Sequence, residues 1–200
     1  MKKVFNFKKI FSTLLLAIAL VVSAVSVSGC SKDDNSNSNS SQATYKVSAE
    51  EKEYLSKRFA DLSKINNEVV AYVYAPGTKL DEPVVQTNDN ETYLDKTFEG
   101  KIVPYLGTVF MDADNNKNFG DRLTWLFGHA RGSKVADNRM FNDVNFYDKQ
   151  EFMDQHKYVV IETPERKYYY EVAFLTIVPE TTSFYRLDFE NDEDFLNQLT

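Results

Sequence analysis

The stretch "EVVAYVYAPGTKLDEPVVQT", Glu68 to Thr87, indicates a chain built mainly from short strands. Its first nine residues are rich in β-branched and aromatic side chains, which suit a pleated sheet. The run stops at Pro76 and Gly77, a pair typical of turns, and "EPVVQT" then resumes the same composition. Two strands separated by a turn are therefore predicted here.

The same composition returns in the runs "GTVFMD", "TWLFGH", "KYVVIET" and "KYYYEVAFLTIV". Residues 164–166, beginning with Pro164, predict a hairpin turn between the last two runs. One helical pattern interrupts the strands near Tyr147 to His156. Many short strands separated by turn signals are typical of a sandwich or a barrel, so a mostly β fold with flanking helices is expected.

Two further helices are predicted, one at each end of this strand-rich region. The first begins after Ser48, because Glu51 follows three residues later in the pattern of a capping box. The apolar residues that then recur at helical spacing are Tyr54, Leu55, Phe59, Leu62 and Ile65. The second helix begins at Asn191, which can cap a first turn of three acids. Its pattern reaches the last residue, so we expect this helix to be cut off.

The first 29 residues have the layout of an export signal, in which four lysines precede the apolar segment Ile10 to Val27. The segment ends in "VSGC", which resembles the lipobox of bacterial lipoproteins. In a lipobox the signal is cut before the cysteine, and the sulfur is acylated. We therefore expect a signal peptide at residues 1–29 and a lipidated Cys30 on the outer face of the cytoplasmic membrane. An uncleaved signal anchor is the alternative, because 18 apolar residues barely span a bilayer.

The polar, low-complexity segment at residues 31–44 is expected to be a flexible spacer. Residues 30–47 would then form a lipidated tether, and residues 48–200 a folded domain. Removing residues 1–29 takes away four lysines and no acid, which changes the net charge from −7 to −11. Such a charge disfavours nucleic-acid binding. Cys30 is the only cysteine, so no disulfide can form within the chain.

Two polar features favour structural interpretations. The loop "DADNNKNFGD", from Asp112, has oxygen ligands at alternating positions, as calcium loops do. Lys117 replaces the required glycine and Leu123 the closing acid, so a polar connection without metal is predicted. His156 is expected at the end of a helix, where the dipole favours a histidine.

His129 differs because it ends the strand-like run "TWLFGH" and precedes a loop, where catalytic side chains are often held. A catalytic histidine needs a nucleophile, such as a serine or a cysteine. No G-x-S-x-G motif is present, and the only thiol is Cys30, in the predicted anchor. The residues alone therefore indicate half of an active site.

Several motifs from Asn66 onward are similar to those of class B sortases. They are "VYAPGTKLDEPVVQ", the D-N-x-x-Y-L segment at Asp89 to Leu94, "FMD", and "GH" followed by "MF". The resemblance implies a mostly antiparallel sortase barrel with added helices, and cysteine transpeptidase activity without a cofactor. It also implies two partners, a surface protein with an NPxTx-like sorting signal and a cell-wall amine.

The resemblance assigns the catalytic histidine to His129. It places Asn115 and Asn116 near the substrate groove, together with Phe127, where relatives usually have tyrosine. The family cysteine, in a T-L-x-T-C motif, and the following arginine would lie on strands after the last helix, and neither motif occurs in these 200 residues. We therefore expect an incomplete barrel that is inactive alone. The alternatives are a non-catalytic surface-binding lipoprotein, a split enzyme and a decayed gene product.

Overall fold

The computed structural model describes residues 15–21, 45–130, 140–179 and 185–198. The predicted lipidation site Cys30 and the spacer lie outside these residues. In chain order the elements are β1 (Leu15–Val21), α1 (Ala49–Ile65), β2 (Val69–Tyr74), β3 (Asp81–Val85), η2 (Thr92–Leu94), β4 (Val109–Met111), β5 (Leu123–His129), η3 (Asn142–Asp148), α2 (Gln150–Gln155), β6 (Tyr158–Glu162), β7 (Lys167–Glu171) and α3 (Asp192–Gln198), where η marks a 3-10 helix.

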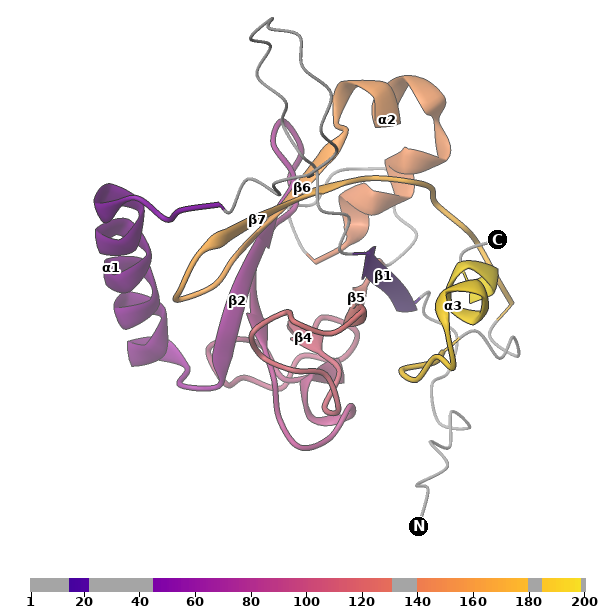
Figure 1. The fold of residues 1–200 in the computed structure, drawn as a ribbon. Coiled ribbons are helices and arrows are strands. Elements are labelled where there is room, and N and C mark those ends of the chain that lie inside the picture. The colour runs from indigo at the N-terminus through magenta and orange to yellow at the C-terminus, as the bar shows by residue number, and fades with distance from the viewer. Residues whose placement is uncertain (1–14, 22–44, 131–139, 180–184, 199–200) are drawn as a thin grey trace, which may run out of the picture.

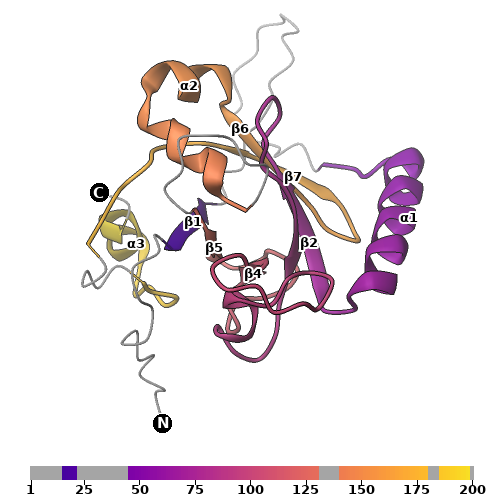
Figure 2. The same cartoon turned by 180° about the vertical axis from the view of Figure 1, so that it is seen from behind.

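One curled sheet, with the strand order β1-β5-β4-β3-β2-β6-β7, organises the molecule. In both views α1 lies on one side, near β2 and β7, and α3 lies on the opposite side, near β1 (Figures 1 and 2). The mostly β fold with flanking helices is confirmed. The sheet is mostly antiparallel, and β3 and β4 form its one parallel pair among the described strands. The long connection between them, which contains η2, returns the chain to the same end of the sheet.

Strand β5 is buried along its whole length. Trp125 and Phe127 pack in one apolar cluster with Leu55 and Phe59 of α1, whereas Leu126 packs in the other cluster with Val73 and Ile161. A strand that is covered on both faces reads as a continuous apolar run rather than an alternating one. This explains the sequence "WLF" before His129.

The predicted first helix is confirmed as α1, and the Ser48 side chain accepts a hydrogen bond from the Glu51 amide. Helix α1 is also held by Glu162 of β6, whose side chain is 1% exposed. Arg58 of α1 and Lys167 of β7 lie 3.0 and 2.8 Å from the two oxygens of this carboxylate. Because both cations meet one buried acid, the helix is fixed in register against the β6–β7 hairpin.

Two predicted segments differ in the structure. The last strand was expected to run through Val178, but β7 ends at Glu171, since its partner β6 begins at Tyr158 and offers one more bond, from the Val172 amide to the Lys157 carbonyl. The apolar segment expected to lie outside the fold contributes β1, which pairs residue by residue with β5. Cleavage of this segment stays a prediction. The part of the chain that the structure describes contains no helix with the length and hydropathy of a membrane span.

Candidate active site

His129 is the last residue of β5, and 5% of its surface is exposed. Its Nε2 lies 2.7 Å from the carbonyl oxygen of Leu94, the last residue of η2. Its own carbonyl accepts a bond from the Phe141 amide at 3.0 Å. The ring is thus held between the end of a rigid strand and the η2 turn, 35 residues earlier in the chain.

The Leu94 contact determines which ring nitrogen carries the proton. A carbonyl oxygen can only accept a hydrogen bond, so Nε2 must be the donor. In the neutral ring Nδ1 then has a free lone pair. Nδ1 is buried and has no hydrogen-bond partner in the described part of the chain. Such a nitrogen can accept a proton from a group placed beside it, as a general base must.

The three residues predicted to bind substrate have structural contacts. Phe127 packs in an aromatic cluster, with ring centroids 5.3 Å from Phe110 and 6.3 Å from Tyr185. Asn115 is buried, and its side chain accepts a bond from the Trp125 amide and donates to the Leu123 carbonyl. The exposed Asn116 bonds within its own loop. Each of these contacts is explained by the fold alone. Substrate binding by Phe127, Asn115 and Asn116 therefore stays a prediction.

The buried carboxylate of Asp112, predicted only as part of a polar loop, makes contacts that the sequence did not predict. Asp112 is fully buried, and its Oδ2 accepts bonds from Asn90 at 2.7 Å and from the Tyr185 hydroxyl at 2.8 Å. Burial, followed by the bond to Asp112, raises the pKa of Tyr185 well above its ordinary value. Asn90 and Leu94 both belong to the D-N-x-x-Y-L segment, which was the available signal for them.

No group of three potential metal ligands occurs among the histidines, cysteines and acids that the structure describes. In the loop that resembles a calcium site, Asp112 bonds Asn90 and Tyr185, and Asp121 accepts bonds from Asn115 and Asn116. These acids hold the loop closed through hydrogen bonds.

His156 has the structural role that the sequence predicts. It caps the C-terminus of α2, and its amide bonds the Phe152 carbonyl. Its Nδ1 lies 3.1 Å from the Pro76 carbonyl, and its ring centroid lies 4.3 Å from that of Phe152. The residue therefore joins α2 to the β2–β3 turn.

Comparison with known proteins gives the family. No family model matches the chain. Sortase B of Staphylococcus aureus is 30% identical over 193 residues, which cover 95% of this chain and 77% of the relative. The chain belongs to the class B sortases. Sortase B of Listeria monocytogenes is 28% identical over 144 residues, which cover 70% of this chain and 56% of that protein. Sortases are cysteine transpeptidases.

Solved structures give the same result for the fold. A substrate complex of S. aureus sortase B superposes with a TM-score of 0.64 at 33% identity, over 72% of this chain and 64% of that one. A mutant form of Clostridium perfringens sortase B gives 0.61 at 25% identity, over 76% and 70%. The chain thus spans somewhat less than two thirds of the solved S. aureus protein.

Proposed function

We propose that residues 45–198 form the histidine-bearing part of a cysteine transpeptidase that acts on the sorting signals of exported proteins. The observation that carries the proposal is the ring of His129, with Nε2 bonded to the Leu94 carbonyl and Nδ1 buried without a partner among the described residues. Membership of the sortase family supplies the reaction. The solved complex of the S. aureus relative with a substrate supports peptide binding by this fold.

In the proposed reaction a cysteine thiol gives its proton to Nδ1 of His129, and the thiolate attacks the scissile carbonyl. The imidazolium then protonates the leaving amine, which yields a thioester. An acceptor amine attacks the thioester, forms the new amide and returns the thiol. The thiol in this scheme lies on a T-L-x-T-C segment other than residues 1–200, because Cys30 is the only cysteine among them.

The proposed location is the outer face of the membrane, with Cys30 as the anchor. The supporting observation is the "VSGC" sequence after an apolar segment. Mass spectrometry of the chain expressed in a Gram-positive host should find acyl groups on Cys30, and none after Cys30→Ala. An unmodified Cys30 that still follows residues 1–29 would instead support the uncleaved anchor.

A chimera tests the function. Residues 45–198 are joined to the C-terminal part of S. aureus sortase B that follows its last helix, which supplies the cysteine and the arginine. The chimera should cleave a sorting peptide in a thiol-dependent reaction, whereas the 200-residue chain alone should not. A chimera that unfolds cooperatively but shows no cleavage would overturn the proposal and favour a surface-binding protein.

A further inference from the structure

We infer that Gly107 and Asp89 are positioning residues for His129, because together they hold the Leu94 carbonyl that keeps the imidazole proton on Nε2. The inference rests on the proposed function only in one respect, that the tautomer of His129 serves catalysis. The geometry itself comes from the η2 turn and from the loop that returns to it.

Gly107 fixes one side of the Leu94 carbonyl. Its φ is +67°, and a Cβ at this position would lie 2.5 Å from the Leu94 oxygen and 2.4 Å from the Tyr93 oxygen. No real side chain tolerates such distances to backbone atoms. The neighbouring Thr108 amide donates to the Tyr93 carbonyl at 3.1 Å. The chain at Gly107 therefore lies directly against the last turn of η2, and only glycine fits there.

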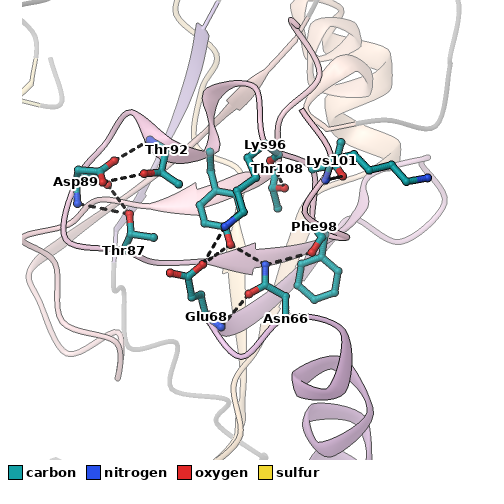
Figure 3. Close-up of polar contacts among 11 residues, drawn as sticks. Asn66, Glu68, Thr87, Asp89, Thr92, Lys96, Phe98, Lys101 and Thr108 are labelled. Carbon is teal, nitrogen blue, oxygen red and sulfur yellow. Dashed lines mark hydrogen bonds and ion pairs between the residues drawn. The ribbon is translucent and has the colours of Figure 1, made fainter. Parts of the chain in front are cut away.

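Asp89 fixes the other end of η2. Its Oδ1 accepts a bond from the Glu91 amide at 2.8 Å. It also accepts the Thr92 amide at 2.7 Å, and its Oδ2 accepts the Thr92 hydroxyl at 2.8 Å (Figure 3). Glu91, the residue that precedes η2, makes no side-chain cap of its own. Asp89 thus satisfies the free amides at the start of the turn.

Tyr93, between these two points, is anchored separately. Its hydroxyl accepts a bond from Asn66 at 2.6 Å and donates to Glu68 at 2.5 Å (Figure 3). The η2 turn is capped by Asp89, hydrogen-bonded through Tyr93 and closely packed against Gly107. The Leu94 carbonyl therefore has little freedom to move. An acceptor held in this way pre-organises the ring and keeps the Nδ1 lone pair on its buried side.

The test is nuclear magnetic resonance of the imidazole nitrogens in the 200-residue chain, which contains only two histidines. Long-range proton–nitrogen correlations distinguish the two tautomers of each ring. We expect a protonated Nε2 for His129. We expect a protonated Nδ1 for His156, whose Nδ1 faces the Pro76 carbonyl, so each ring is an internal reference for the other.

Gly107→Ala should give His129 a mixture of tautomers and leave His156 unchanged. Gly100→Ala is the matched control, because Gly100 has a φ of +82° but a Cβ there would meet nothing within 4 Å. In the chimera, Gly107→Ala should lower kcat/KM by about 100-fold, as a misplaced catalytic group does. Gly100→Ala should leave it nearly unchanged.

If Gly107→Ala fails to fold, the His156 signals will move as well. The Asp89 variants then test the inference. Asp89→Ala should mix the tautomers of His129, and Asp89→Asn, which keeps an acceptor oxygen, should restore the single form. A wild-type His129 with its proton on Nδ1 overturns the inference. So does an unchanged single tautomer in folded Asp89→Ala. Because this measurement needs no thiol, it can fail while the chimera is active, and the reverse also holds.

Discussion

The two histidines of this chain meet the backbone through opposite ring nitrogens. His129 approaches the Leu94 carbonyl through Nε2, and His156 approaches the Pro76 carbonyl through Nδ1. His156 lies at a helix end with its ring against Phe152, whereas His129 is buried with an unpartnered Nδ1 among the described residues. A buried polar atom without a partner costs about 1–3 kcal/mol. Of the two histidines, only the one with proposed chemistry bears this cost, as expected where a side chain is kept for a reaction.

Exchanging each histidine for glutamine tests the comparison most directly. In the chimera, His129→Gln should lower the rate of thiol-dependent cleavage by about 100-fold or more, because the amide keeps a donor for Leu94 but removes the base. His156→Gln should change the rate little. Equal losses in the two variants would contradict separate roles for the histidines.

Gly77→Ala should disturb the surroundings of His156 without affecting His129. Its φ is +82°, and a Cβ there would lie 2.8 Å from Cε1 of His156. The strained backbone and the displaced ring should together lower the free energy of unfolding by about 2 kcal/mol, measured in urea. Gly100→Ala has the same φ without the contact and should lose roughly half as much. The nitrogen signals of His129 should not move.

Removing residues 1–29 should affect only the strand of His129. Strand β1 pairs with all seven residues of β5, from Leu15 opposite His129 to Val21 opposite Leu123. Without it, the amides of residues 123–129 that face β1, which are every second one, should exchange with deuterium about tenfold faster, because they lose their bonding partners. The Trp125 amide, which bonds Asn115, should keep its rate. Strand β6, at residues 158–162 after His156, pairs with β2 and β7 and not with β1. Its amides should exchange at the same rate in both chains. Identical exchange across β5 would show that β1 does not protect it.

Acid should slightly loosen the C-terminal segment, residues 185–198, which packs against Trp125 of β5. The bonds from Arg186 and from the Glu190 amide lower the pKa of Asp194 from 3.8 to about 2. Because the folded pKa is the lower one, this stabilisation is complete above the ordinary value and is lost as the pH falls toward 2. The single tryptophan, Trp125, donates to the Arg186 carbonyl and reports the change as a red shift of its emission. Asp194→Asn should abolish that acid phase, and a phase that persists in this variant would have another origin.

Local features could be predicted from the sequence. Helix α1 follows from the Ser48 cap and a single apolar stripe, and the β6–β7 hairpin follows from its Pro164 turn. The family resemblance assigns the catalytic role to His129, which stays a prediction. The Leu94 carbonyl could not be predicted, because every residue has a carbonyl and the contact joins two segments that are distant in the sequence. The parallel β3–β4 pair and the early end of β7 likewise depend on which strands become neighbours, which only the tertiary fold decides.

The attachment of α1 has a mechanical consequence for a protein held to a membrane by its N-terminus. A pull on an anchor at Cys30 would enter the folded part at Tyr45, whose hydroxyl bonds Glu51 and whose ring lies under Arg166 of the β6–β7 turn. From there the force would pass through α1 into Glu162 and its two cations. That route ends at β6 and β7, at the opposite border of the sheet from His129. Tension on such a tether would reach the strand of His129 only through the apolar packing of Leu55 and Phe59 against Trp125 and Phe127.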